Sequence, residues 1–123
     1  MSAQPDFLLY VRDMRAAAHK ALTFVRGMDF QAFAADEKTQ FAVIRALEIM
    51  GEAAKKVPPE ARALYPEIPL YPEIPWREIA GMRDKLVHDY GGVNLAVVWR
   101  TLEEDLPSLQ KQLRTLLEDF GGA

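Results

Sequence analysis

The segment GMRDKLVHDYGG, residues 81–92, gathers side chains suited to acid–base and phosphate chemistry. His88 carries an imidazole, whose unperturbed pKa of about 6.5 lets it give or take a proton near neutral pH. Arg83 carries a permanently charged guanidinium, whose fork of N–H groups matches the oxygens of a phosphate. Asp84 follows the arginine directly, and Tyr90 precedes two glycines that mark the end of a helix.

The same residues also have an ordinary structural explanation. At about 100° per residue, Arg83 lies within the apolar face of its predicted helix, which consists of Trp76, Ile79, Leu86, Val87 and Tyr90. Burying an unpaired guanidinium is prohibitive, so Arg83 must face a cleft or pair with an acid such as Glu48 or Glu52. His88 lies about 140° around the axis from Arg83 and, alone, is typical of a helix end. The spacing of these residues by itself does not decide between a catalytic and a structural role.

The composition excludes several kinds of site and protein. The 123 residues include no cysteine, which excludes disulfides, thiolate chemistry and Cys-based zinc sites. Only His19 and His88 are histidines, with no HExxH-type pair, so we expect no metal and no other cofactor. A net charge of −3 argues against binding nucleic acid by bulk attraction. No segment approaches the roughly 20 apolar residues that span a bilayer, so we expect a cytoplasmic protein.

Apolar residues recur with helical periodicity in three long runs, of which two lie in the first half of the chain. The first run covers residues 7–25 and ends at Gly27. The second covers residues 43–57 and has a second stripe of small residues beside its apolar stripe. A helix that is apolar on two sides needs two neighbours, so we expect this helix to be central.

The third run covers residues 95–120, with Asn94 as the expected N-cap and a kink or restart expected at Pro107. No stretch alternates apolar and polar residues as a strand does, so we predict an all-α chain with one domain over residues 1–123. Before this run the hexapeptide LYPEIP occurs twice, in residues 64–75, where its prolines predict an irregular loop. The loop is either a spacer or a proline-rich segment that binds a partner.

Basic residues form a stripe on the first predicted helix. Arg12, Arg15, His19 and Arg26 flank its apolar seam. In an acidic protein such a local stripe can follow the phosphates of RNA. The alternative is that these residues solvate the helix or pair with acids of a neighbour.

The combination R-x4-H-x-Y, from Arg83 through His88 to Tyr90, resembles the motif of the HEPN superfamily of ribonucleases. Three further segments extend the resemblance over nearly the whole chain, to the HepT toxins of type VII HepT–MntA toxin–antitoxin modules. They are IRALEIMGEAAKKV (residues 44–57), YPEIPWREIAGMRDKLVHDYGGVN (residues 71–94), and the final helix with EEDLPSL. The resemblance implies a HEPN-type up-and-down helical bundle.

The resemblance also implies a chemistry and an assembly. HEPN ribonucleases are metal-independent, and cut RNA by attack of a ribose 2′-hydroxyl on the adjacent phosphate. His88 would then handle protons, Arg83 would stabilise the phosphate, and Asp84 would orient or modulate one of them. HEPN proteins work as homodimers, so we expect the motif helices of two chains to face each other across an interfacial groove, which eases the divergence of Arg83 and His88.

Tyr90 takes a regulatory role from the same resemblance. In HepT toxins the tyrosine of H-x-Y is the acceptor of an AMP group. The MntA antitoxin, a minimal nucleotidyltransferase, transfers this group from ATP and uses Mg²⁺. A bulky anion beside His88 would block the groove and repel RNA phosphates, so the enzyme would be switched off without unfolding.

Two alternatives remain open on the sequence. The first is a non-catalytic helical dimer that serves as a binding or regulatory subunit of a nucleotidyltransferase. The second is a degenerate nuclease whose groove is obstructed by the lengthened proline loop. Replacing His88 would abolish RNA cleavage by a nuclease, but would change only partner binding or stability in a non-catalytic subunit. Deleting one LYPEIP copy would raise the activity of an obstructed nuclease.

Overall fold

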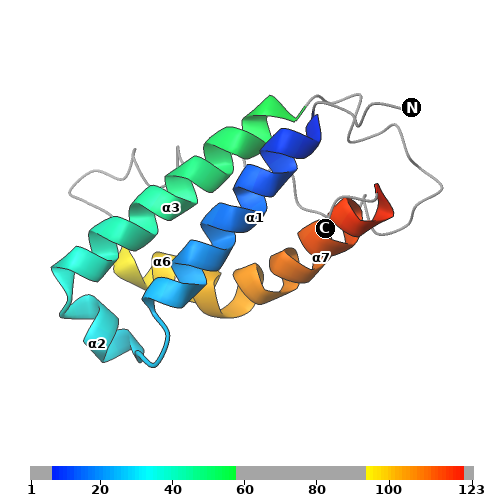
Figure 1. Ribbon diagram of the computed structural model, residues 1–123. Coiled ribbons are helices and arrows are strands. Elements are labelled where there is room, and N and C mark those ends of the chain that lie inside the picture. Colours follow the sequence, from blue (N-terminus) through cyan, green and yellow to red (C-terminus); the bar gives the residue numbers. More distant parts are fainter. Residues whose placement is uncertain (1–6, 58–93, 121–123) are drawn as a thin grey trace.

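The computed structural model describes residues 7–57 and 94–120, and every regular element within these ranges is helical (Figure 1). The prediction of an all-α chain is confirmed for this part of the molecule. The LYPEIP loop and the segment with Arg83, Asp84, His88 and Tyr90 lie outside the described residues. No described helix is long and apolar enough to cross a membrane.

Helix α1, Phe7–Phe24, packs along α3, Glu37–Lys56, and the two run in opposite directions (Figure 1). The predicted apolar stripe of α1 forms the centre of this contact, since Val11, Met14 and Ala18 are fully buried. After α1 the chain turns at Gly27, whose φ of 81° lies in the left-handed region that favours glycine. The predicted helix and its stop are both confirmed.

The two stripes of α3 have different surroundings. All members of the apolar stripe are buried, namely Val43, Leu47, Met50, Ala54 and Val57. In the small-residue stripe, Ala46 and Ala53 are buried, but Ile49 is 37% exposed. Among the described elements α3 packs chiefly on α1, with a smaller contact to α2, so this stripe has no second long helix upon it there.

The short helix α2, Phe30–Ala34, was not predicted, because five residues are too few to show a periodicity. Its ends are fixed by side chains. The Asp29 carboxylate accepts a hydrogen bond from the Ala32 N–H at 2.8 Å, and Gln40 Nε2 donates to the carbonyls of Phe33 and Ala34, both at 2.9 Å. Phe33 is fully buried, and its ring centroid lies 5.3 Å from that of Trp99.

The third predicted run forms three successive elements, α6 (Leu95–Arg100), a π-helical turn η1 (Thr101–Asp105) and α7 (Leu106–Asp119). Asn94 is the N-cap, as predicted, and its Oδ1 accepts hydrogen bonds from the N–H groups of the second and third helical residues at 3.0 and 3.3 Å. The restart at Pro107 is also confirmed. Proline has no N–H, and in a regular helix its ring would clash with the carbonyl four residues back. The helix therefore widens into the π turn η1 just before Pro107 (Figure 1).

The end of α7 returns to the start of α1. The rings of Phe7 and Phe120 meet edge to face, with centroids 5.7 Å apart and planes at 89°. Leucines of α7 complete the core, and Leu113 is fully buried. As a result α1 lies between α3 on one side and α7 on the other, and each pair of helices forms a surface groove.

The N-cap of α3 gives a pH-dependent contribution to stability. The backbone N–H and then the hydroxyl of Thr39 donate to Asp36, at 3.1 and 2.9 Å, and hold the pKa of its carboxyl below the ordinary 3.8. The stabilisation is therefore complete at neutral pH and is lost as pH falls through the lowered pKa.

We expect Asp36→Ala to lower the urea midpoint at pH 7 and to lower it much less near pH 2. An equal loss at both values would contradict this assignment.

Candidate functional site

The predicted catalytic group lies in the segment between the two described parts of the chain. Arg83, Asp84, His88 and Tyr90 follow the end of α3 at Val57 and precede the N-cap Asn94 in the sequence, and all four lie outside the described residues. Their roles and the expected pairing of Arg83 with Glu48 or Glu52 therefore stay predictions. On α3 itself, Glu48 is half-buried and Glu52 is exposed.

The basic stripe of α1 lies in the described part of the chain, and the structure brings most of it together. Arg12, Arg15 and His19 lie on one face of α1 and line a hollow of about 390 Å³ between α1 and α7. Gln110 and Leu117 of α7 form the opposite wall. Both arginines are half-buried, and His19 is exposed. Arg26 does not line this hollow, because α1 ends at Phe24 and Arg26 is exposed in the turn that follows.

Sequence reasoning missed Gln110. A neutral polar residue on the third run gives no charge signal, and its place opposite Arg12 and Arg15 depends on how α7 packs on α1. The available signal was helical spacing, because Gln110 and Leu117 stand seven residues apart on one face of the helix. The hollow that they form with α1 has two arginines in its lining, Arg12 and Arg15.

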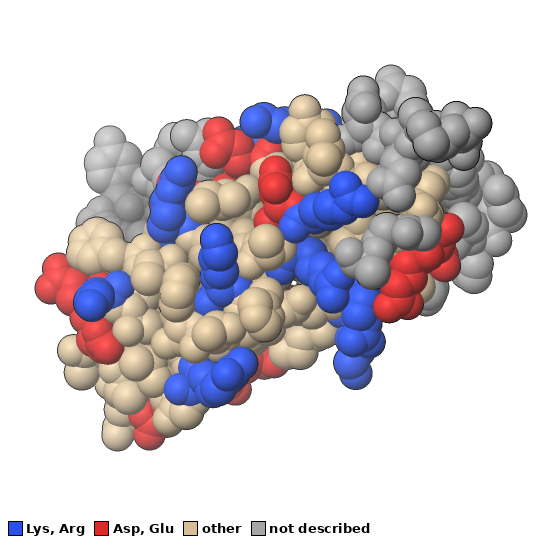
Figure 2. Space-filling model, viewed as in Figure 1, with Lys and Arg blue, Asp and Glu red and all other residues tan. Residues whose placement is uncertain are grey.

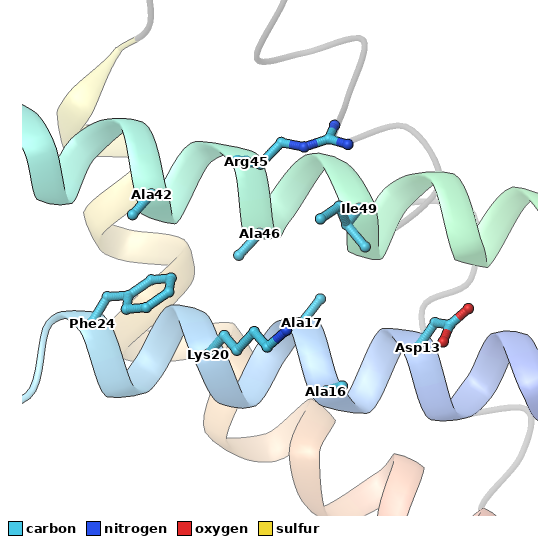
Figure 3. A pocket seen from close by; sticks show the side chains of 9 residues that line it. All are labelled: Asp13, Ala16, Ala17, Lys20, Phe24, Ala42, Arg45, Ala46 and Ile49. Carbon is cyan, nitrogen blue, oxygen red and sulfur yellow. The ribbon is translucent and has the colours of Figure 1, made fainter.

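A second groove lies between α1 and α3 and has a different character (Figure 3). Ala17, Ala42 and Ala46 lie between the two helices and let them approach closely, and Ala16 stands at the edge of the groove on α1. Phe24 and Ile49 contribute apolar surface, with exposed fractions of 41% and 37%. Asp13, Lys20 and Arg45 stand at its edges, so acidic and basic groups are mixed. The groove, of about 260 Å³, is suited to packing better than to binding an anion.

Comparison with known proteins shows the family of this chain. The Ribonuclease HepT-like family model matches residues 14–116. The chain belongs to this family. A protein of Thermococcus cleftensis named "Probable ribonuclease HepT" is 49% identical over 107 residues, which cover 87% of this chain and 92% of that protein. The resemblance to HepT proteins is thereby confirmed.

Other relatives of this HepT-like chain carry similar names. "Putative RNase MJ0125" of Methanocaldococcus jannaschii is 36% identical over 94% of this chain and 94% of its own length. "Putative RNase TTE0752" of Caldanaerobacter subterraneus is 43% identical over 76% of this chain and 79% of its own length. No solved structure matches the chain at a significant level.

The family match includes the whole R-x4-H-x-Y motif, and with it Arg83, Asp84, His88 and Tyr90. Of the basic stripe, Arg15, His19 and Arg26 lie within the match and Arg12 lies just before it. In residues 7–57 and 94–120, no three His, Asp or Glu side chains stand together as ligands of a metal ion.

A third hollow of this HepT-like chain is lined in part by a residue that follows the R-x4-H-x-Y motif closely in the sequence. It measures about 530 Å³, lies where α2, α3 and α6 meet, and includes Leu95, the residue after the N-cap Asn94. Phe41 and Ile44 of α3 also line it, and Phe41 is 67% exposed.

Proposed function

We propose that this HepT-like protein is a metal-independent endoribonuclease. The observation that carries the proposal is the R-x4-H-x-Y motif, Arg83 to Tyr90, inside a chain that matches the Ribonuclease HepT-like family over residues 14–116. Imidazole and guanidinium groups supply the proton transfer and the charge stabilisation that RNA cleavage needs, without a metal ion.

The reaction is a transfer within the RNA. The 2′-oxygen of a ribose attacks the adjacent phosphorus and loses its proton to a general base. The bond from phosphorus to the 5′-oxygen of the next nucleotide breaks, and that oxygen takes up a proton from a general acid. The products are a 2′,3′-cyclic phosphate and a 5′-hydroxyl, and no water is consumed. His88 accepts or donates a proton in this step, Arg83 neutralises the charge that grows on the phosphate, and Asp84 orients one of them.

The active form is a two-fold dimer of one-domain chains whose motif helices face a shared groove. On a single helix Arg83 and His88 diverge by about 140°, so a site that uses both is more easily built from two copies. Exposed apolar side chains on α3 support an association, since Phe41 and Ile49 are 67% and 37% exposed.

Mixed dimers test the shared site. We expect co-expressed Arg83→Ala and His88→Ala chains to recover about a quarter of the parent activity, although each variant alone is inactive. Half of randomly paired dimers contain one variant of each kind, and each of these keeps one intact combination of Arg83 and His88. The measurement is the cleavage rate of the whole dimer population purified from the co-expressing cells. No recovery in dimers verified by native mass spectrometry would mean that each chain carries its own site.

The cellular role that fits this enzyme is that of a toxin in a toxin–antitoxin module. An MntA-like nucleotidyltransferase would transfer AMP from ATP to the Tyr90 hydroxyl and release pyrophosphate, with Mg²⁺ bound by the transferase and its nucleotide. The AMP group adds negative charge two residues from His88, where it pairs with Arg83 and repels RNA. The antitoxin thus acts by chemistry on the toxin and needs no lasting complex.

Incubation of the purified protein with total RNA in EDTA tests the proposal. Cleavage that persists in EDTA and is lost in His88→Ala supports a metal-independent ribonuclease. Intact RNA with a protein whose Tyr90 is unmodified by mass spectrometry favours the non-catalytic subunit instead. Activity that appears only after deletion of one LYPEIP copy identifies an obstructed nuclease.

A further inference from the structure

The hollow between α1 and α7 has the charge of an anion site. Arg12, Arg15 and His19 project from successive turns of α1, and Gln110 faces them from α7. No acidic residue is among the described residues that line it. Figure 2 shows Lys and Arg side chains spread across the face that carries α1, with Asp and Glu side chains among them, and the protein as a whole has a net charge of −3. The excess of positive charge belongs to the lining of this hollow and not to the whole face.

Other hollows on the described helices do not share this property. The α1–α3 groove has Asp13 in its lining, and the small hollow beside Tyr10 has Asp13 and Glu52. The apolar hollow at α2, α3 and α6 is lined by Glu37 and by no arginine or lysine. An acid in each of these surfaces repels phosphate, so the α1–α7 hollow is the best anion site of the four.

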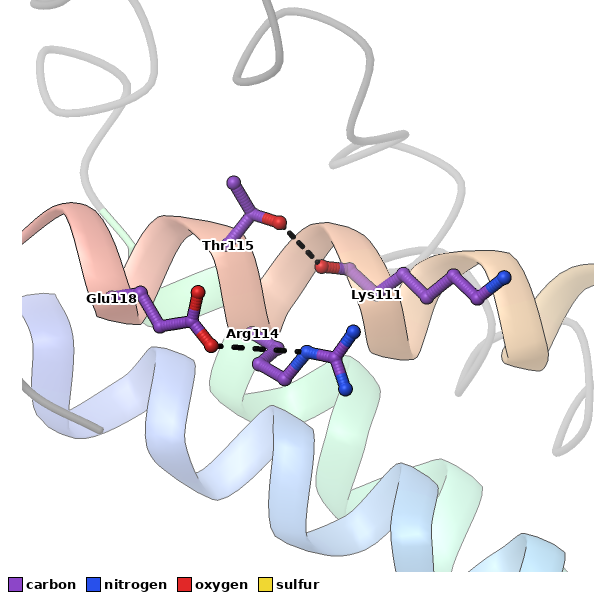
Figure 4. A network of polar contacts seen from close by, with 4 residues as sticks. All are labelled: Lys111, Arg114, Thr115 and Glu118. Atoms are coloured by element: carbon purple, nitrogen blue, oxygen red, sulfur yellow. Dashed lines mark hydrogen bonds and ion pairs between the residues drawn. The ribbon is translucent and has the colours of Figure 1, made fainter.

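A further arginine stands on the same side of α7. Arg114 lies between Gln110 and Leu117 in the i, i+4, i+7 series that forms one helix face. Its Nε lies 3.9 Å from Glu118 Oε1, and the two side chains are 55% and 61% exposed (Figure 4). An ion pair this long and exposed is weak, so the guanidinium can turn to an incoming phosphate at little cost.

We propose that the α1–α7 hollow binds the phosphate backbone of single-stranded RNA, as a subsite of the proposed ribonuclease. Arg12 and His19 are seven residues apart, about 10 Å along the helix, which is enough to contact more than one phosphate. The arginines provide charge, and the Gln110 amide can donate to a phosphate or a ribose oxygen. Because these contacts do not read bases, the subsite positions RNA without selecting its sequence.

RNA binding without cleavage tests this inference. The probe is a fluorescein-labelled single-stranded RNA with 2′-O-methyl riboses, which has phosphates but no attacking hydroxyl. We expect Arg15→Gln to weaken binding about three- to tenfold near 0.1 M salt, and to reduce the slope of log affinity against log salt by about 0.7. Gln110→Glu should weaken binding at least as much, because it adds a negative charge to the hollow without removing an arginine.

Arg45→Gln is the matched control, since it removes the same charge from the α1–α3 groove. We expect it to leave the salt slope unchanged. Equal losses in Arg15→Gln and Arg45→Gln, or no binding of the probe by the parent, would overturn the subsite. Circular dichroism verifies that each variant is folded. Because the probe cannot be cut, a dependence of binding on the hollow would stand even if the protein failed to cleave RNA.

Discussion

Replacing His88 with alanine should lower the single-turnover rate of RNA cleavage by about 10²- to 10⁴-fold, the range typical of losing a general acid–base group. An imidazole has an unperturbed pKa near neutral pH, and no other histidine lies between Arg83 and Tyr90. The measurement is the rate at saturating protein on a defined RNA, with folding checked by circular dichroism. A variant that cuts at the parental rate would remove His88 from the mechanism.

The matched control for this experiment is the other histidine of the chain. His19 lines the α1–α7 hollow, where it contacts RNA in our account but takes no part in the chemistry. His19→Ala should therefore raise the protein concentration needed for half-maximal rate and leave the maximal rate unchanged. If His19→Ala lost as much of the maximal rate as His88→Ala, the assignment of proton transfer to His88 alone would be contradicted.

Transfer of AMP to Tyr90 should reduce cleavage to the level of the His88→Ala protein. The modified side chain would occupy the groove and present a phosphate to Arg83, in competition with RNA. The test is to treat the protein with an MntA-like nucleotidyltransferase, ATP and Mg²⁺, to locate the added AMP by peptide mass spectrometry, and to measure cleavage in the same sample. Full activity of protein modified at Tyr90 would contradict a regulatory role.

Tyr90→Phe separates the hydroxyl from the ring. We expect this variant to cut RNA about as well as the parent, because phenylalanine keeps the apolar ring in place. It should keep this activity in the presence of the transferase and ATP, since it has no acceptor oxygen. Inhibition of Tyr90→Phe by the same treatment would show that AMP acts at another residue.

Periodicity in the sequence predicted the long helices well, because an amphipathic helix must repeat its apolar residues to form a core. The stripe of α1 and the apolar stripe of α3 are buried as predicted, Asn94 caps α6, and Pro107 stands at a restart. These features depend on neighbours within a few residues. For that reason they can be read from the chain alone.

Other features depend on tertiary packing and were not predictable in this way. Helix α2 has five residues, and it is held by Gln40 of the next helix and by the contact of Phe33 with Trp99. The π turn before Pro107 shows how the chain accommodates the proline, which the sequence marked only as a break. The small-residue stripe of α3 predicted two neighbours, and among the described helices it lines an open groove with α1.

The candidate site divides in the same way. Residue types and spacing, together with the resemblance of the flanking segments, indicated the motif from Arg83 to Tyr90, and the family match includes it. The basic stripe was also visible in the sequence, but its opposite wall was not. Gln110 joins Arg12 and Arg15 only because α7 folds back along α1, so a surface shared by helices distant in sequence required the structure.

The chemistry of the cut RNA ends distinguishes attack by the 2′-hydroxyl from metal-dependent hydrolysis. We would digest a defined RNA with the purified protein in EDTA, alongside His88→Ala, and identify the new termini by mass spectrometry. We expect 2′,3′-cyclic phosphate and 5′-hydroxyl ends from the parent and intact RNA from the variant. Ends with a 3′-hydroxyl and a 5′-phosphate, or cleavage that stops in EDTA, would contradict metal-independent attack by the 2′-hydroxyl.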